Sequence, residues 1–388
     1  MDSLAKLELL GRQTGHEPAE EVSPVGRRAT LFSGDELLPG AIHQACTPAG
    51  PITLLKGMVS NACERNCLYC PFRAGRDVRR EVLAPDELAL TFAKLHQANV
   101  VQGLFLSSGI VGSGVRTQDR IIAVAEILRR RYRFGGYLHL KIMPGAEPEQ
   151  IRQTMALADR VSINLEAPNG ERLANLAPRK AFLDELVEPL RRVEQIRQEV
   201  GGHPGIWRNR RRSGPSLSTQ FVVGPAGESD RELLRTTAYL MRRLGLARAY
   251  FSAFRPVAGT PLENRPPESP DRERRLYQAS YLLRDYGFAV EELAFDRREH
   301  LPLGQDPKLA WAWQHLVDAP LEVNTVSQQE LLRIPGVGPR LAQRLAEARV
   351  HGRLRDVGDL GRLGVPVEKA APFILLDGRR PPQQLRLF

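Results

Sequence analysis

The segment from residue 61 to residue 71 reads Asn61-Ala-Cys63-Glu-Arg-Asn-Cys67-Leu-Tyr-Cys70-Pro71. It holds three of the four cysteines in a chain of 388 residues, with the spacing C-x3-C-x2-C. A disulfide framework is not arranged this way in a long chain, so the spacing favours metal binding. Three thiolates on one loop can hold three irons of a four-iron cube and leave the fourth iron open to a small ligand. We therefore predict a [4Fe–4S] cluster on Cys63, Cys67 and Cys70.

A structural zinc site is the alternative. Zinc usually takes four protein ligands, often as two C-x2-C pairs, and the second pair is missing here. Cys46 would be a distant fourth ligand, and His43 or His96 stays open as another. We interpret Cys46 itself as a small buried or surface residue rather than a ligand.

Apolar strand-like runs alternate with helical patterns from Ile52 onward, after a short N-terminal helix over Ser3–Gly11 and an extended segment. The predicted strands are Ile52–Val59, Val101–Leu106, Tyr137–Ile142, Arg160–Leu165, Ser218–Val223 and Ala249–Ala253. The predicted helices are Pro85–Ala98, Thr117–Tyr132, Pro148–Ala158, Ala181–Val200 and Asp230–Leu244. Repeated strand–helix units imply parallel strands with right-handed crossovers. The expected fold is α/β: a partial (β/α)6 barrel, with active-site loops at the carboxyl ends of the strands and a small all-α domain at the C-terminus.

Composition changes along the chain suggest the domain boundaries. We expect an N-terminal extension (1–50), the barrel (51–300), a connector (301–321), a small helical domain (322–376) and a flexible tail (377–388). The arginine-rich stretch 201–216 is read as a solvated loop, with a basic strap over nucleic acid as the alternative.

The small C-terminal domain carries a helix–hairpin–helix pattern. Ser327 and Glu330 form a predicted capping box, and Pro335-Gly336-Val337-Gly338 is followed by Pro339 at a helix start. Glycines at such a hairpin let backbone N–H groups approach a phosphate. The predicted DNA-binding residues are Gly336, Val337, Gly338 and Arg340. The alternative is an αα-hairpin that only packs on the barrel; a second hairpin near residues 363–366 lacks the second glycine and is read as a structural partner.

The chain ends in Gln384-Leu385-Arg386-Leu387-Phe388. This resembles the peptide by which bacterial repair and replication proteins bind the sliding clamp, with apolar anchors inserted into a groove. The predicted partner-binding residues are Gln384, Leu385, Leu387 and Phe388. A frayed tail without a partner is the alternative.

The formal net charge is +10 and the pI is about 9.7. This balance fits a polyanionic partner, nucleic acid first, although an arginine-rich solvated surface gives the same balance. No apolar run reaches the roughly 18 residues that a membrane span needs, and residues 1–10 lack a signal-peptide core. We expect a cytoplasmic protein.

The cysteine segment resembles the signature of radical S-adenosylmethionine (SAM) enzymes, which place an aromatic residue, here Tyr69, before the last cysteine. The resemblance implies a [4Fe–4S] cluster whose open iron binds SAM, a reductant such as flavodoxin or ferredoxin, and hydrogen abstraction by a 5′-deoxyadenosyl radical. It also implies SAM contacts after the strands. The residues it indicates are Tyr69, Ser107, Ser108, Gly109, Asn164, Glu166 and Gly224, although serines replace the usual Gly-Glu pair at 107–108. Lys141, Gln220 and Arg255 lie at or near predicted strand ends and are candidate catalytic residues.

Over nearly its whole length the chain resembles a bacterial family of radical SAM proteins assigned to DNA modification or repair. The stretches of this chain that carry the resemblance include Leu54–Cys63, Arg160–Pro168 and Leu331–Gly338. The resemblance implies DNA as substrate and a uracil-DNA-glycosylase-like protein as partner. Two alternatives remain: a radical SAM enzyme that modifies tRNA or rRNA, and a non-catalytic iron–sulfur repair factor tethered to the sliding clamp.

Overall fold

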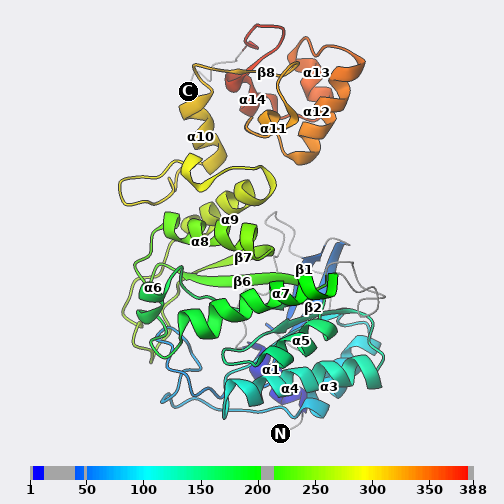
Figure 1. Cartoon of the computed structure of the whole chain (residues 1–388), viewed down its shortest axis with the longest axis vertical. Helices are drawn as coiled ribbons and strands as arrows, with labels where there is room; N and C mark the ends of the chain where they lie inside the picture. The colour runs from blue at the N-terminus through cyan, green and yellow to red at the C-terminus, as the bar shows by residue number, and fades with distance from the viewer. Residues whose placement is uncertain (1–2, 13–39, 48–49, 202–213, 383–388) are drawn as a thin grey trace. The chain divides into compact units, whose positions relative to one another are not determined.

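The computed structural model describes residues 3–12, 40–47, 50–201 and 214–382 (Figure 1). The chain separates into two compact units, which we describe one at a time. The first contains residues 1–228 and 239–268, and the second contains residues 229–238 and 269–388. Residues 269–300, which the sequence assigned to the barrel, therefore belong to the second unit. The lone cysteine outside the motif, Cys46, lies on an edge strand of the first unit, opposite Pro51.

The first unit is built on a seven-stranded sheet in the order β1-β2-β3-β4-β5-β6-β7, curled as a partial barrel. The strands are β1 (Ile42–Thr47), β2 (Gly50–Met58), β3 (Gly103–Ser107), β4 (Tyr137–Lys141), β5 (Arg160–Ser162), β6 (Ser216–Val223) and β7 (Leu246–Ala253). β2 to β7 are parallel, and β1 adds to the edge of β2 in the antiparallel sense. The carboxyl ends of six strands thus meet at one edge, as a barrel site requires.

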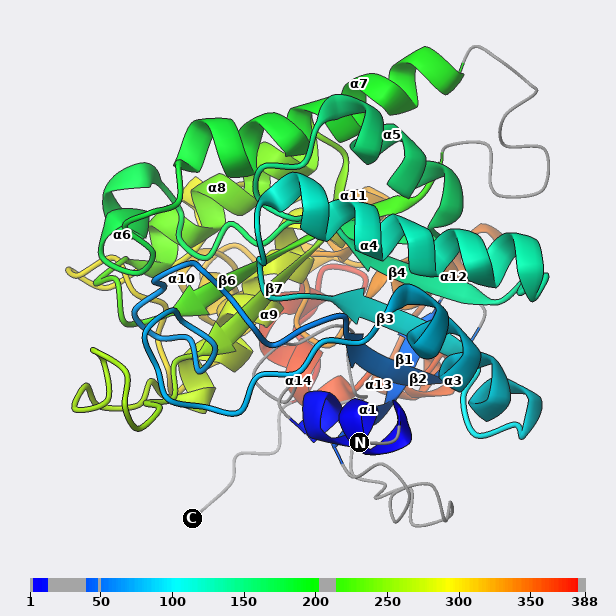
Figure 2. The same ribbon diagram turned by 90° about the horizontal axis from the view of Figure 1, so that it is seen from below.

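Helices return the chain between the parallel strands and lie along one side of the sheet (Figure 2). They are α3 (Pro85–Gln97), α4 (Gly114–Glu126), α5 (Pro148–Leu157), α6 (Gly170–Ala174) and α7 (Glu188–Gly201). The residues of α8 (Asp230–Arg243) are divided between the two units. The π-helical segments η2 (Ile127–Arg131) and η3 (Phe182–Val187) extend α4 and precede α7. The N-terminal helix α1 (Ser3–Arg12) contacts β2 and α3.

The predicted α/β partial barrel is confirmed, with each predicted strand and helix present. Two details differ. The antiparallel edge strand β1 lies in the segment that we read only as extended. β5 ends at Ser162 instead of Leu165, because the chain then bends toward β6 and Glu166 adopts a left-handed backbone (φ 65°).

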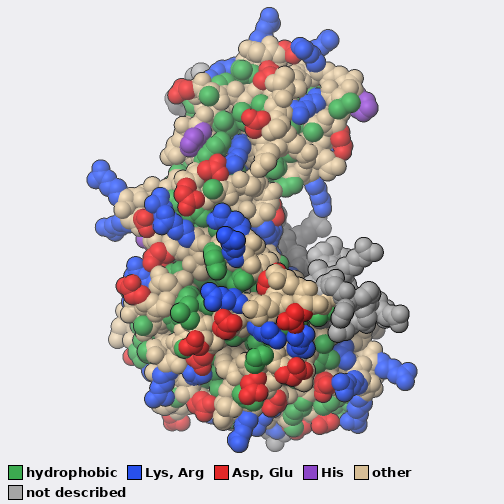
Figure 3. Space-filling model, in the orientation of Figure 1, with side chains coloured by type: hydrophobic (Ala, Val, Ile, Leu, Met, Phe, Trp, Pro, Cys, Tyr) green, Lys and Arg blue, Asp and Glu red, His purple; other side chains and the backbone are tan. Residues whose placement is uncertain are grey.

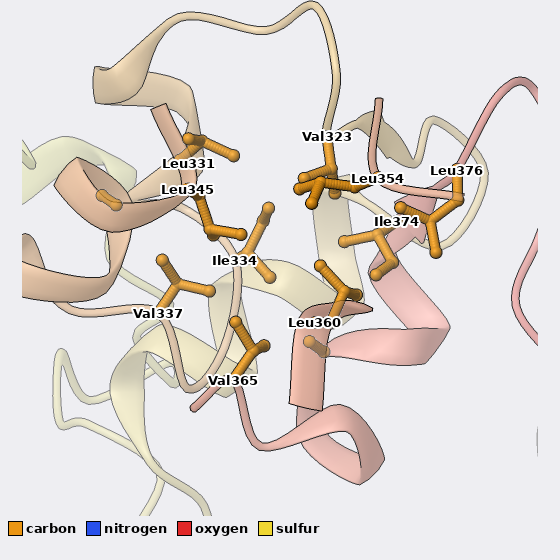
Figure 4. Packing of buried hydrophobic residues seen from close by; sticks show 12 residues of the cluster. Val323, Leu331, Ile334, Val337, Leu345, Leu354, Leu360, Val365, Ile374 and Leu376 are labelled. Carbon is orange, nitrogen blue, oxygen red and sulfur yellow. The ribbon is translucent and has the colours of Figure 1, made fainter. Parts of the chain in front are cut away.

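The second unit includes α9 (Pro270–Asp285), η4 (Val290–Glu292) and α10 (Pro307–His315). Its C-terminal part contains α11 (Gln328–Leu331), α12 (Pro339–His351), α13 (Val357–Arg362), α14 (Val367–Ala370) and η5 (Ala371–Phe373). It is not purely helical, because β8 (Leu321–Glu322) pairs in parallel with β9 (Ile374–Leu375). Aliphatic side chains such as Leu331, Ile334 and Leu360 fill a core of its own (Figure 4).

Among the helices that the structure describes, none is both long and apolar enough to cross a bilayer.

Candidate active site

The three motif cysteines lie on the cysteine loop, residues 61–81, which follows β2. Side chains at its start tie its two ends together. Asn61 Nδ2 donates to the carbonyl of Arg79 at 2.8 Å, and Asn61 Oδ1 accepts from the backbone N–H of Glu81 at 2.7 Å. Ser60 Oγ donates to the Glu81 carbonyl at 2.8 Å. The loop is therefore closed at its base by side-chain hydrogen bonds.

Two arginines hold the cysteine loop from within. The guanidinium of Arg80 donates to the carbonyls of Asn61 (2.6 Å), Phe72 (2.9 Å) and Arg73 (2.9 Å). Arg76 donates at 2.5 Å both to the carbonyl of Pro71 and to that of Ala258, in the segment after β7. A guanidinium suits this task because its donors are fixed in one plane.

The surroundings of the thiols disfavour the thiolate form unless a metal centre balances its charge. Cys67 is buried, while Cys63 and Cys70 are partly exposed. Backbone N–H groups of Ile110 and Phe72 lie 3.5 and 3.4 Å from the sulfurs of Cys63 and Cys70. Burial raises the pKa of Cys70 to about 12, reinforced by Cys67, and burial also raises the pKa of Cys67. Buried thiolates of like charge need a cationic centre, so these residues fit a metal cluster.

Within the described ranges, no three His, Cys, Asp or Glu side chains converge on one point. The histidines considered for zinc are engaged elsewhere: His96 Nδ1 bonds the Val101 carbonyl at 2.9 Å, and His43 Nε2 bonds that of Gly40 at 3.0 Å.

The turn after β3 lies directly against the cysteine loop. Gly109 N–H donates to the Ser60 carbonyl at 2.7 Å, and a Cβ at Gly109 would lie 2.1 Å from the Ala62 carbonyl oxygen. Only glycine fits there. Ser108 Oγ donates to the Gly109 carbonyl at 2.7 Å. Ser107 Oγ is buried and has no hydrogen-bond partner among the described atoms, so it can serve a ligand.

A buried ion pair lies beside the thiols. Glu166 Oε1 and Lys180 Nζ are 2.9 Å apart, with side chains only 5% and 9% exposed. Burial opposes the charge on Glu166, but Lys180 and Lys141 lower the pKa of its carboxyl below the ordinary value. Burial lowers the pKa of Lys141 to about 8, with Glu166 opposing. The phenol of Tyr69 has a raised pKa because it is buried and faces Glu166.

The backbone around Glu166 connects this pair to β6. Glu166 N–H donates to the Gln220 carbonyl at 2.9 Å, and Val222 N–H donates back to the Glu166 carbonyl at 2.8 Å. Asn164 Nδ2 donates to Gln220 Oε1 at 3.2 Å. Gln220 thus lies within β6, inside the predicted strand Ser218–Val223.

The other predicted site residues occupy the same edge of the sheet. Gly224 follows β6 with φ 107°, and a Cβ there would lie 2.4 Å from Glu268 Oε2. Arg255 follows β7, is exposed, and has no described contact with the Glu166 group.

The structure thus brings together Tyr69, Lys141, Asn164, Glu166 and Gln220. Sequence reasoning missed Lys180, which lies between two helical segments with no motif around it. The only signal for Lys180 in the sequence was that a basic residue follows Glu166, which lies at the end of a predicted strand.

The C-terminal hairpin has the geometry expected from its glycines. Gly336 has φ 82°, and Val337 N–H closes the turn on the Ile334 carbonyl at 3.0 Å. The predicted capping box is confirmed: Glu330 N–H donates to Ser327 Oγ at 3.1 Å, and Ser327 N–H to Glu330 Oε2 at 2.7 Å.

The base of this hairpin is held by a buried lysine. Lys308 Nζ, from α10, donates to the Val337 carbonyl at 2.6 Å. Gly338 caps α12, and Arg340 in its first turn is exposed. The predicted clamp-binding residues 384–388 lie outside the described part of the chain.

Residues 58–240 match the radical SAM superfamily. The FeFe-hydrogenase maturase HydG from Carboxydothermus hydrogenoformans is similar at 16% identity and TM-score 0.46, over 59% of this chain and 51% of that one. Methylornithine synthase (PylB) is similar at 15% identity and TM-score 0.46, over 59% of this chain and 61% of that one.

A radical SAM methyltransferase from Sphaerobacter thermophilus is similar at 17% identity and TM-score 0.43, over 62% of this chain and 66% of that one. This chain therefore spans about half to two thirds of the length of these solved structures.

Proposed function

Since residues 58–240 form a radical SAM superfamily domain and the chain is a radical SAM enzyme, we propose that it acts on nucleic acid, in DNA modification or repair. The observation that carries the proposal is a phosphate-binding type of hairpin, Gly336–Gly338, in the same chain as the three-thiol loop.

The cofactors of this enzyme are a [4Fe–4S] cluster and SAM, and a reductant is required. When bound and reduced, they supply a carbon radical that abstracts a hydrogen atom from the substrate. Cys63, Cys67 and Cys70 would hold the cluster. Tyr69, Ser107, Ser108, Gly109, Asn164, Glu166 and Gly224 would hold SAM.

Each part of the site has a task that its geometry supports. Arg80 fixes the carbonyls of the cysteine loop and so keeps its three sulfurs in place. The buried Glu166–Lys180 pair offers both a hydrogen-bond acceptor and a donor to SAM without a net charge. Lys141 and Gln220 lie on the inner face beyond it, where they would meet the substrate, and the exposed Arg255 would meet it at the rim.

The hairpin supports binding to the phosphate backbone rather than to particular bases. Gly336 forms the turn with a positive φ, and α12 begins directly after Gly338, so the first backbone N–H groups of α12 are the donors that would meet a phosphate. Arg340 adds a positive charge beside it. Contacts of this kind position the nucleic acid on the protein but do not discriminate between base sequences.

Chemistry and substrate class can be tested together. The anaerobically reconstituted enzyme should form 5′-deoxyadenosine with SAM and reductant, and duplex DNA should stimulate it. The Cys67→Ala variant should bind less iron and should form no 5′-deoxyadenosine. Turnover that RNA stimulates and DNA does not would contradict the DNA assignment, and an iron-replete protein without turnover would favour a non-catalytic repair factor.

The hairpin has a matched pair of glycine variants. Gly336→Ala places a Cβ 2.3 Å from Pro366 Cγ at a positive φ, whereas Gly361→Ala meets nothing within 4 Å. We expect Gly336→Ala to weaken DNA binding roughly tenfold at fixed salt, as the loss of about one phosphate contact does. Equal affinity of both variants would contradict the role of the hairpin.

We also propose two protein partners. One is a uracil-DNA-glycosylase-like protein that acts in the same repair process. The other is the sliding clamp, bound through Gln384, Leu385, Leu387 and Phe388. Removing residues 384–388 should abolish co-elution with the clamp and leave DNA binding intact; unchanged co-elution would exclude this tail as the clamp ligand.

A further inference from the structure

One ion pair of the first unit joins the cysteine loop to a segment far along the chain. Arg65, between Cys63 and Cys67, pairs with Glu185 of η3, and the two side chains are only 21% and 19% exposed. On the face of the molecule drawn in Figure 3, by contrast, basic and acidic side chains are interspersed at the surface, where ion pairs contribute little. Because solvent and salt screen a largely buried pair less, Arg65 and Glu185 can hold their two segments together.

The same ion pair holds the backbone on both sides of Lys180. Arg65 donates to the Arg179 carbonyl at 2.7 Å, and Glu185 Oε2 accepts from the Ala181 N–H at 2.9 Å. The Glu185 N–H in turn donates to the Ala181 carbonyl at 3.0 Å. The carbonyl that precedes Lys180 and the N–H that follows it are therefore both fixed by one ion pair.

Backbone hydrogen bonds attach the other end of this segment. Leu68 N–H, from the cysteine loop, donates to the Leu176 carbonyl at 2.7 Å, and Lys180 N–H closes a turn on the Ala177 carbonyl at 2.9 Å. Leu176 and Ala177 are buried. Residues 176–185 are thus attached to the cysteine loop at points before and after Lys180.

The position of the Lys180 side chain depends on this backbone. A lysine loses much rotamer freedom when its ammonium is fixed, and a backbone that is already held leaves less freedom to lose. Lys180 Nζ lies 2.9 Å from Glu166 Oε1, whereas Glu166 Oε2 is buried without a hydrogen-bond partner among the described residues, although the Tyr69 phenol faces the same carboxylate. A buried oxygen of this kind indicates a place for a ligand. The backbone at Lys180 thus decides how the carboxylate presents its second oxygen.

We propose that the Arg65–Glu185 ion pair positions Lys180, and through it Glu166, for binding SAM. Arg65 and Glu185 are positioning residues, because they act on SAM only through the segment that carries Lys180. Since Arg65 lies between two of the proposed cluster ligands, the pair also sets where the Lys180 ammonium lies relative to the thiols. The inference rests on the SAM-binding role proposed above for Glu166 and Lys180 and does not depend on the nucleic-acid substrate.

The experiment measures SAM binding to the anaerobically reconstituted protein, below the unfolding temperature of every variant. SAM is titrated while the electron paramagnetic resonance spectrum of the reduced cluster is recorded, and iron content is measured on the same samples. Glu185→Ala removes the ion pair and the acceptor for the Ala181 N–H, whereas Glu185→Gln removes the charge and keeps an acceptor. Asp184→Ala, which removes the exposed carboxylate next to it on η3, is the matched control.

We expect Glu185→Ala to keep the iron content of the wild-type protein and to weaken SAM binding roughly tenfold, as the loss of a supporting contact at a metal site commonly does. Glu185→Gln should weaken SAM binding less, and Asp184→Ala should leave it unchanged. Lys180→Met should weaken SAM binding at least as much as Glu185→Ala, and adding Glu185→Ala to Lys180→Met should cause no further loss. This lack of additivity separates a residue that acts through Lys180 from one that only stabilises the fold.

The outcomes separate the inference from the role proposed for the buried pair. Wild-type SAM affinity in Glu185→Ala, together with weakened binding in Lys180→Met, would overturn the inference alone. So would additive losses in the double variant, or a Glu185→Ala protein that loses iron, since Glu185 would then hold the cysteine loop instead.

If Glu185→Ala does not fold, Glu185→Gln decides the matter. Weakened SAM binding with full iron content supports the inference, and wild-type affinity overturns it. Wild-type affinity in both Lys180→Met and Glu166→Gln would refute the SAM-binding role of the buried pair, and the inference with it.

Discussion

Lys180→Met should be far more damaging than its place in a loop suggests. The ammonium lies 2.9 Å from Glu166 Oε1, and both side chains are almost fully buried. At an effective dielectric constant of about 20, unit charges at this separation attract by roughly 6 kcal/mol. Most of that attraction offsets the cost of desolvating both groups.

The variant leaves the Glu166 carboxylate buried without its partner. Breaking a buried pair from one side costs about 3–5 kcal/mol. For a unit of this size that corresponds to a fall in Tm of about 6–20 °C. Removing both charges in Glu166→Gln/Lys180→Met should recover much of the loss, since no uncompensated charge remains.

The assay is thermal and denaturant unfolding of both single variants, the double variant and Lys94→Met as an exposed-lysine control. The double-mutant cycle isolates the coupling between the two side chains. A loss below about 1 kcal/mol for Lys180→Met, or a double variant as unstable as the sum of the singles, would refute the reasoning.

Two further predictions use other features of the chain. Gly109→Ala should displace the cysteine loop and lower the iron content of the reconstituted protein, because the added Cβ would overlap the Ala62 carbonyl. The control variant Gly135→Ala, whose Cβ meets nothing within 4 Å, should retain its iron. Equal iron content in the two variants would contradict the close packing at Gly109. Burial lowers the pKa of Lys308 from 10.5 to about 7 in the folded chain. Between these two pH values the unfolded state therefore binds more protons than the folded state does. The free energy of unfolding of the C-terminal part should consequently rise with pH from about 7 toward 10. Lys308→Met should flatten this rise, by up to about 1.4 kcal/mol per pH unit, in unfolding followed by tryptophan fluorescence; a parallel pH profile would exclude Lys308 as its source.

The sequence predicted features that depend on near neighbours in the chain. The thiol spacing, the capping box at Ser327 and the periodicity of the helices are local, and each could be read directly. The strands could also be predicted from their apolar sequence patterns, because the leucines on their outer face pack against the helices.

Features set by distant partners could not be read. Lys180 meets Glu166 only because the chain turns after β5, and Arg80 finds its carbonyls only once the cysteine loop has closed. β1 lies in a segment with weak alternation and is a strand because the edge of β2 accepts it.

Arg76 makes the first and last parallel strands of the barrel mechanically dependent on each other. An incomplete barrel has an open side, and hydrogen bonds of the sheet do not cross it. One guanidinium instead connects the loop after β2 to the segment after β7, through Pro71 and Ala258. Any movement of residues 254–268 would therefore be transmitted through Arg76 to the backbone beside Cys70, one of the three proposed cluster ligands.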